Sequence, residues 1–279
     1  MDDTRVLAGD GVEIAIHDLG GHGEPALVAH ATSFHGRCYQ LLAGELAGAF
    51  RSYAPDLRGH GASGAPPHLD FDWNGFRDDV VAAVRGLGLE RPVGIGHSCG
   101  GAALLLAEAQ YPGTFAALYC YEPIVFDPGV FDPDRIAEHV GAARRRRADF
   151  DSGEAALERY RDSPLGVLAP LALEAYVEHG FEQVDGGVRL RCLPEYEALI
   201  YEASTRSDAG LRLAEVTCPV TVAYGTTSGF FGAACLPLLA EGLPDVRLAA
   251  LEGLGHLGPL EDPGAVARSI IRVVERAAT

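Results

Sequence analysis

One serine stands between two glycines at residues 96–100, which read Gly-His-Ser-Cys-Gly and fit the G-x-S-x-G pattern of a nucleophile elbow. An apolar run precedes Ser98 and an Ala/Leu-rich stretch follows it, so the serine stands at a sharp turn between a predicted strand and a predicted helix. Side chains two positions before and after the serine would collide in this turn, so both positions favour glycine. The free N–H groups of the helix favour negative charge beside Ser98. The pattern predicts a serine nucleophile; the alternative is a small polar residue in a tight turn.

A serine hydroxyl is a poor nucleophile at neutral pH and needs a base that takes its proton. The chain has 10 histidines, so context must select one of them. His256 ends the Gly-rich run Gly253-Leu254-Gly255, between the last predicted strand and the last predicted helix. Such a loop can fold back over the carboxyl edge of a parallel sheet, where the serine of an elbow points. We therefore predict that His256 is the general base; the alternative is an ordinary loop histidine.

Three further histidines lie near the same predicted edge. His30 and His60 follow predicted strands, and His97 directly precedes the nucleophile. We expect structural roles for all three. His30 would brace the loop that follows its strand, His60 would fix a turn, and His97 would point away from Ser98.

The elements that must position these residues alternate between strand and helix. Apolar runs predict buried strands, and apolar residues three or four positions apart predict helices. Outside residues 127–212, the predicted strands are residues 11–18, 26–30, 52–56, 93–96, 115–121, 219–225 and 246–251. The predicted helices are residues 41–50, 71–87, 101–111, 236–242 and 262–276. The alternation predicts an α/β fold, with a mainly parallel sheet covered by helices on both faces.

Residues 127–212 have a different character, because charge rises and helical patterns dominate. The predicted helices here are residues 135–150, 154–162, 172–181 and 195–206. The segment is too long and too helical for a connecting loop, so we predict a helical cap inserted between core segments 1–126 and 213–279. The run of four arginines at 144–147 is expected to form an exposed helix face that pairs with neighbouring carboxylates, not a nucleic-acid patch.

The amino-acid composition limits the classes of protein to which this chain can belong. The 279 residues, 48% of them apolar, suit one large domain or one domain with an insertion. The 22 basic and 39 acidic residues give a net charge of −17, which argues against nucleic-acid binding through a basic surface. The six cysteines contain no C-x-x-C pair, which indicates buried reduced thiols rather than a disulfide frame or a zinc site. No signal peptide and no membrane span are evident, so we expect a cytoplasmic protein of unknown oligomeric state.

Four motifs in order resemble those of α/β-hydrolase-fold serine hydrolases with a helical cap. They are Ala29-His30 with its loop, residues 56–63, the Ser98 elbow, and the run that ends at His256. The resemblance covers nearly the whole chain and is specific for the fold, not for a substrate. It implies a hydrolase that needs no metal and no organic cofactor.

The chain departs from the family's commonest pattern at the acid that orients the histidine. That acid usually follows the strand after the cap in a G-x-x-D context, where this chain has Ser228. Glu122 is the better candidate, because it ends the predicted strand that follows the elbow helix. Roughly eleven helical residues at ~1.5 Å and about six strand residues at ~3.3 Å nearly cancel, which returns the chain to the edge where Ser98 lies. Haloalkane dehalogenases are similar in taking their acid from this position. Asp127 is the reserve acid, and the alternative for Glu122 is a carboxylate that caps a turn.

An oxyanion hole needs two backbone N–H donors aimed at the developing negative oxygen. Cys99, the residue after the nucleophile, supplies one of them through its backbone alone. By resemblance the second comes from the loop after His30, where the family usually has His-Gly-X and X donates. Here the run reads His30-Ala31-Thr32, so Thr32 is the expected donor and Ser33 the second choice.

These residues together predict that Ser98 attacks an acyl carbon, with His256 as base and Glu122 orienting the imidazole. Water activated by the same histidine then releases the acid. Ester hydrolysis is the first expectation, and lactone, thioester and carbon–carbon bond hydrolysis use similar machinery. A serine nucleophile argues against epoxides and haloalkanes, which would need an aspartate.

Two other classes of function stay open. A ligand receptor could keep the pocket and lose the chemistry, as the serine at 228 suggests, or the fold could perform cofactor-free oxidation or peroxide chemistry. The expected partner is a small, partly apolar molecule. Candidates for an apolar pocket lining, which could equally be cap core, are Phe126, Phe131, Tyr160, Tyr176 and Phe181.

Overall fold

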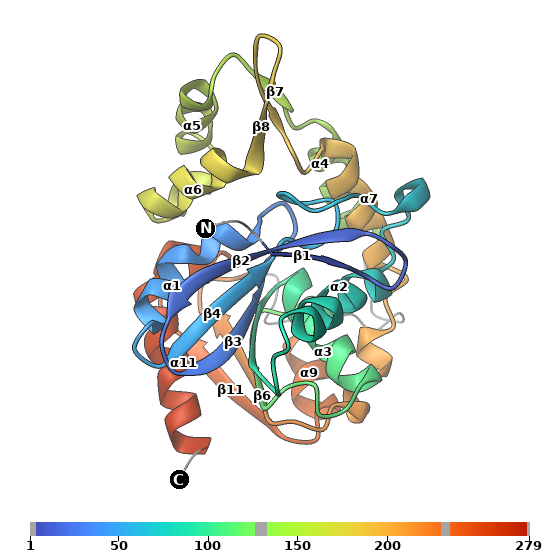
Figure 1. The fold of residues 1–279 in the computed structure, drawn as a ribbon, viewed down its shortest axis with the longest axis vertical. Helices are drawn as coiled ribbons and strands as arrows, with labels where there is room; N and C mark the ends of the chain where they lie inside the picture. The colour runs from blue at the N-terminus through green and yellow to red at the C-terminus, as the bar shows by residue number, and fades with distance from the viewer. Residues whose placement is uncertain (1–3, 126–132, 230–234, 278–279) are drawn as a thin grey trace.

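A computed structural model describes residues 4–125, 133–229 and 235–277 (Figure 1). In these residues an eight-stranded sheet has the spatial order β1-β2-β4-β3-β5-β6-β10-β11. Its strands are β1 (Thr4–Leu7), β2 (Glu13–Gly21), β3 (Glu24–Ala29), β4 (Phe50–Pro55), β5 (Val93–His97), β6 (Ala117–Tyr121), β10 (Val220–Gly225) and β11 (Val246–Leu251). β2 pairs antiparallel with β1 and β4, and every other pair is parallel. The prediction of a mainly parallel sheet is confirmed, and the short edge strand β1 adds to it.

Helices cover both faces of the sheet (Figure 1). They are α1 (Gln40–Leu46), α2 (Trp73–Gly86), α3 (Cys99–Gln110), α9 (Leu236–Gly242), α10 (Gly258–Glu261) and α11 (Pro263–Ala277). α1 and α11 pack on one face, where Leu42 and Ile270 belong to one hydrophobic cluster. α2, α3 and α9 pack on the other, where Val80 and Leu239 belong to a second. The doubly covered sheet expected from the alternating pattern is therefore present.

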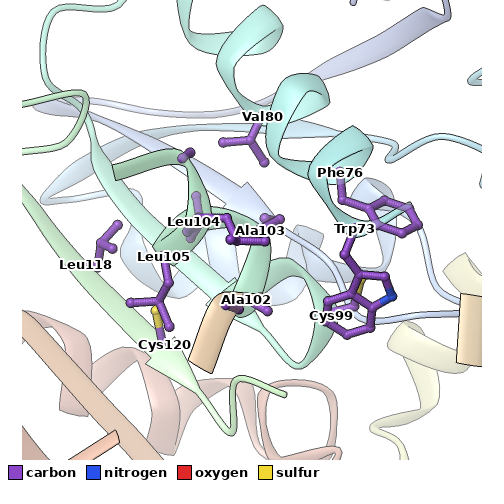
Figure 2. Packing of buried hydrophobic residues seen from close by; sticks show 14 of the residues in the cluster. Trp73, Phe76, Val80, Cys99, Ala102, Ala103, Leu104, Leu105, Leu118 and Cys120 are labelled. Atoms are coloured by element: carbon purple, nitrogen blue, oxygen red, sulfur yellow. The ribbon is translucent and has the colours of Figure 1, made fainter. Parts of the chain in front are cut away.

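The helix that follows the predicted elbow is almost wholly buried. Residues 99–109 of α3 are all buried, and all of them except Cys99 and Glu108 are alanine, leucine or glycine. Figure 2 shows Trp73, Phe76 and Val80 of α2 packed beside the small residues of α3. Trp73 also donates from its indole Nε1 to the Ile200 backbone oxygen at 3.2 Å. The packing holds the start of α3, and with it Ser98, rigidly against the sheet.

Between β6 and β10 the chain forms a separate layer beyond one end of the main sheet (Figure 1). We call residues 133–204 the inserted segment. Its elements are α4 (Pro133–Arg144), β7 (Asp149–Phe150), α5 (Gly153–Arg161), α6 (Pro170–Gly180), β8 (Phe181–Val184), β9 (Gly187–Leu190) and α7 (Pro194–Ser204). β7, β9 and β8 form a small antiparallel sheet.

The prediction of a mainly helical insertion was wrong in one place and missed a hairpin in another. The helix predicted over 135–150 ends at Arg144, and residues 149–150 form a strand instead. Residues 181–190 form the β8–β9 hairpin, with pairs from Phe181–Leu190 to Val184–Gly187. The Asp185-Gly186 turn is a hairpin signal that could have revealed these strands, since Gly186 adopts φ +83°.

All six cysteines are free and buried. Throughout the described ranges, no helix is both long enough and apolar enough to cross a membrane. Each of the parallel strands β3, β5, β6, β10 and β11 ends at one common edge of the sheet, and the loops that leave this edge carry the candidate site.

Candidate active site

Ser98 lies between β5 and α3 with a strained backbone, at φ 55° and ψ −119°. The two flanking glycines are required by close contacts. A Cβ atom on Gly96 would lie 2.5 Å from the Gly101 Cα, and one on Gly100 would lie 2.3 Å from the Ala29 backbone oxygen. The geometry therefore explains why glycine stands two positions before and two positions after the serine.

A chain of hydrogen bonds joins Ser98 to two residues that are far away in sequence. The His256 Nε2 lies 3.2 Å from the Ser98 Oγ, and its Nδ1 lies 2.7 Å from the Glu122 Oε2. A carboxylate can only accept, so Nδ1 carries the proton and Nε2 is free to accept from the serine hydroxyl. This arrangement can withdraw a proton from Ser98 and stabilise the positive charge that then forms on His256.

Glu122 is completely buried and is held from two further sides. The Gly225 backbone N–H donates to its Oε1 at 3.0 Å, and the Ser228 hydroxyl donates to its Oε2 at 2.7 Å. Its own backbone has a positive φ of 43° and donates to the Ala223 oxygen of β10 at 2.8 Å. The serine that stands where the family commonly has an acid thus supports the carboxylate that reaches the same histidine.

The backbone N–H groups of Cys99 and Thr32 donate no hydrogen bond within the described parts of the chain. The Gly100 N–H donates to the His30 oxygen at 3.1 Å and so ties the loop after β3 to the first turn of α3. Ser33, the second choice, is less suited, because its N–H donates to the His60 Nε2 at 3.1 Å. Burial raises the pKa of the Cys99 thiol to about 12, so it is not a competing thiolate.

His30 and His60 brace this loop. The Leu57 N–H donates to the His30 Nε2 at 2.8 Å, so the His30 Nδ1 carries a proton and donates to the Ala31 oxygen at 2.8 Å. His60 likewise accepts from Ser33 and donates from Nδ1 to the Arg58 oxygen at 2.9 Å. Burial lowers the pKa of His30 to about 3, so it stays neutral.

His97 points away from Ser98, as expected. It holds the backbone of His256, a contact that the sequence did not reveal. Its Nε2 lies 2.7 Å from the His256 backbone oxygen, which can only accept. Its Nδ1 is therefore the acceptor for the Tyr39 hydroxyl at 2.7 Å, and the Tyr39 oxygen accepts from the Ala31 N–H at 3.1 Å. We call Ala31–Tyr39–His97–His256 the buried relay. It links the loop before Thr32 to the backbone of the histidine.

Other hydrogen bonds fix the loop that carries His256. The Tyr121 hydroxyl donates to the Gly255 oxygen at 2.7 Å, and the Gly255 N–H donates to the Glu261 Oε2 at 3.0 Å. The Thr227 N–H and hydroxyl both donate to the Leu254 oxygen. The imidazole is therefore held on a rigid support, although the His256 side chain is 37% exposed.

A cavity of about 780 Å³ opens between these loops and the inserted segment. Ser98, His256 and Thr32 line it from the sheet side, and Tyr160 and Tyr176 line it from the inserted segment. Phe181 is buried in contact with both tyrosine rings and does not line the cavity. The expected lining residues Phe126 and Phe131, and the reserve acid Asp127, lie outside the described residues.

The arginine run differs from the exposed helix face that was expected. Arg144 does pair with the exposed Glu195 and Glu202 at 3.0 Å. Arg146 instead turns inward, with a side chain only 19% exposed, and pairs with Glu197. The expected helix face does not form because α4 ends at Arg144, so the next three arginines are not part of the helix.

In the described part of the chain, no group of three or more His, Cys, Asp or Glu side chains could hold a metal ion.

Comparisons with known proteins agree with the α/β fold. The sequence model of the alpha/beta hydrolase family matches residues 26–269. The chain is 27% identical to a 2-(acetamidomethylene)succinate hydrolase from Mesorhizobium japonicum, over 91% of this chain and 89% of that protein. It is 28% identical to a pimeloyl-[acyl-carrier protein] methyl ester esterase from Chromobacterium violaceum, over 85% of this chain and 88% of that protein. A crystal structure of E-2-(acetamidomethylene)succinate hydrolase superposes with a TM-score of 0.85 at 23% identity, over 98% of both chains.

Proposed function

This chain belongs to the alpha/beta hydrolase family, and we propose that it is a serine hydrolase that cleaves an ester-type bond through an acyl-enzyme on Ser98. The two relatives named above are hydrolases. His256 acts as the general base and Glu122 orients it. The backbone N–H groups of Cys99 and Thr32 stabilise the tetrahedral intermediate.

The observation that carries the proposal is the continuous contact from Ser98 Oγ to His256 at 3.2 Å and on to Glu122 at 2.7 Å. As the Oγ–carbon bond forms, the hydroxyl proton passes to the His256 Nε2 and Glu122 stabilises the imidazolium. The same Nε2 then gives its proton to the leaving group. A water molecule repeats the sequence, with His256 taking its proton, and the acyl group leaves as the free acid.

We propose the two oxyanion donors from the places of their backbone N–H groups beside Ser98. Cys99 stands at the first turn of α3, directly after Ser98, and Thr32 lies on the loop that Gly100 ties to that turn. Both backbone N–H groups are free of other acceptors in the described residues, so they can turn to a developing oxyanion. Two such donors contribute the largest single electrostatic stabilisation in acyl transfer.

We further propose the division into a core of residues 1–126 and 213–279 and a cap of residues 127–212. The cavity is bounded by residues of both parts, among them Ser98 of the core and Tyr160 of the cap. A cap in this position encloses the substrate and contributes most of the side chains that select it.

The bond itself is proposed as a carboxylic ester, with a lactone, a thioester, an amide or a carbon–carbon bond as alternatives that use the same steps. One relative is named as an esterase and another as a hydrolase of an acetamido compound, which supports acyl transfer to water in general. A non-catalytic receptor is less well supported. The serine at 228, which first suggested it, donates to Glu122 and so helps to hold this carboxylate in place.

The test is turnover of p-nitrophenyl acetate and butyrate by the wild-type chain and by Ser98→Ala. We expect the variant to lose at least about 10³-fold in kcat, because the nucleophile is removed. The matched variant Ser63→Ala removes a partly buried hydroxyl from the loop after β4, away from the cavity lining, and should keep its activity. A wild-type protein that binds but does not turn over any ester, or a Ser98→Ala variant with unchanged kcat, would overturn the proposal.

A further inference from the structure

Arg146 holds two tyrosine hydroxyls together on the cavity wall. Its Nη2 donates to the Tyr176 hydroxyl oxygen at 2.6 Å and to the Tyr160 hydroxyl oxygen at 3.2 Å. The other end of the guanidinium pairs with Glu197. Because one nitrogen reaches both oxygens, the two hydroxyls are close neighbours, and all of these side chains line the cavity that contains Ser98.

The direction of these hydrogen bonds is fixed by chemistry. A guanidinium has donors and no acceptor, so both tyrosine oxygens accept from Arg146. Each O–H proton must then point elsewhere, and neither hydroxyl donates to any acceptor among the described residues. Burial raises the pKa of Tyr176 well above its ordinary value, which keeps its proton in place at neutral pH. Two adjacent O–H donors therefore have no acceptor among the described residues; Tyr160 is 8% exposed at the cavity wall, and Tyr176 is fully buried beside it.

The charge of the same wall favours an anion. Five arginines line the cavity, namely Arg135, Arg145, Arg146, Arg147 and Arg159, and Glu197 is its only acidic lining residue among those described. Arg145 and Arg159 form no ion pair with any carboxylate of the described chain. The whole chain carries a net charge of −17, so this basic wall runs against the overall balance. Glu197 neutralises Arg146, which leaves the positive excess on the more exposed arginines.

We propose that the Tyr160 hydroxyl, which Arg146 holds together with the buried Tyr176 hydroxyl, binds a carboxylate of the substrate on the side of the cavity formed by the inserted segment. A phenol O–H can donate to a carboxylate oxygen, and Arg145 and Arg159 attract the anion into the cavity. The substrate is then an acyl compound with a carboxylate away from the scissile bond. This inference rests on the proposed hydrolysis at Ser98 and names the class of substrate.

The test compares two esters that share one leaving group, p-nitrophenyl butyrate, which is neutral, and mono-p-nitrophenyl succinate, which carries a carboxylate. The measured quantity is the ratio of their kcat/KM values. We expect this ratio to favour the succinate ester in the wild type and to fall about tenfold or more in Tyr160→Phe/Tyr176→Phe, because hydrogen bonds to a charged group are lost. The matched variant Tyr201→Phe, whose hydroxyl also borders the cavity but donates to Glu197, should keep the wild-type ratio.

A ratio that stays the same in the double variant, or that falls equally in Tyr201→Phe, would overturn the carboxylate site. Calorimetric titration of Ser98→Ala with succinate and with neutral succinamide separates this inference from the proposed reaction. Binding of succinate alone, lost in the two-tyrosine variant, supports the site even where no ester is turned over. Equal binding of both compounds, or of neither, rejects the site even where esters are hydrolysed.

Discussion

Ser98 and Glu122 both have a positive backbone φ, 55° and 43°, which residues other than glycine rarely adopt. Each is held there by tertiary hydrogen bonds, from the Ser98 N–H to the Tyr121 oxygen at 3.0 Å and from the Glu122 N–H to the Ala223 oxygen at 2.8 Å. Strained residues persist only where their surroundings determine them. Here the strain turns two side chains from neighbouring strands toward one imidazole.

At the residue scale, the first prediction concerns which acid orients the His256 imidazole. Glu122→Gln should lower kcat by about 10³-fold or more, since the carboxylate no longer stabilises the imidazolium. Adding Ser228→Asp should restore at least about tenfold of this loss, because the Ser228 Oγ lies 2.7 Å from the same carboxylate oxygen that contacts His256. Steady-state kinetics on a p-nitrophenyl ester measures both effects.

Asp127→Asn is the matched control for the acid. It removes the reserve carboxylate and should leave kcat close to the wild-type value. A larger loss in Asp127→Asn than in Glu122→Gln would show that the wrong acid was chosen.

Ser98, His256 and Glu122 could each be proposed from a local pattern, an elbow, a Gly-rich loop and the end of a strand, and the structure brings the three side chains within hydrogen-bond distance. The role of Ser228 could not be predicted in the same way. Its position only suggested a missing acid, and its donation to Glu122 depends on how β6 and β10 pair side by side. Partners of this kind are set by sheet order, which no short motif contains.

At the element scale, loops at the carboxyl edge of the sheet are tied to one another by the buried relay. Tyr39 precedes α1, His97 ends β5, and His256 follows β11, so three separate elements meet in it. Removing one hydroxyl of the relay should therefore disturb both the loop that carries Thr32 and the loop that carries His256.

Tyr39→Phe tests this coupling. It leaves the buried Ala31 N–H and the His97 Nδ1 without partners, so we expect the free energy of unfolding to fall by about 2–3 kcal/mol. kcat should fall as well, with a smaller change in KM. Urea unfolding and ester kinetics measure the two effects. Tyr53→Phe is the control, because its hydroxyl bonds to no described residue; equal behaviour of the two variants would contradict the relay.

Helices and strands were predicted well where the periodic pattern of apolar residues is long, and poorly where the element has too few residues to show a pattern. The helix at 71–87 and the strand at 246–251 agree with α2 and β11 to within two residues. β7 has only two residues and β1 only four, too few for a repeating pattern to emerge. The inward turn of Arg146 follows from the end of α4 and from packing against Tyr176, which depends on tertiary structure.

At the scale of the whole molecule, buried neutral histidines make stability depend on pH. Burial lowers the pKa of His30 to about 3 and that of His35 to about 4, against an ordinary value of 6.5. Below pH 6.5 the unfolded chain therefore binds protons that the folded chain does not. Stability is fully present above pH 6.5 and is lost as the pH falls toward 4.

Between pH 7.5 and pH 5.0 the loss begins near pH 6.5 and therefore runs over about 1.5 pH units. At about 1.4 kcal/mol for each pH unit and histidine, these two histidines should together lower the free energy of unfolding by about 4 kcal/mol. Urea unfolding at both pH values measures this loss. His35→Gln should reduce the loss by about 2 kcal/mol, the share of one histidine, whereas the exposed control His22→Gln should leave it unchanged. Equal stability at the two pH values would contradict the assignment of neutral buried histidines.

Covalent capture identifies the nucleophile, which we expect to be the Ser98 hydroxyl. The protein is treated with a fluorophosphonate, digested, and the peptides are mapped by mass spectrometry. We expect one phosphonyl adduct on the peptide that contains Ser98, and no adduct on Ser98→Ala. An adduct on any other residue, or labelling that survives Ser98→Ala, would contradict it.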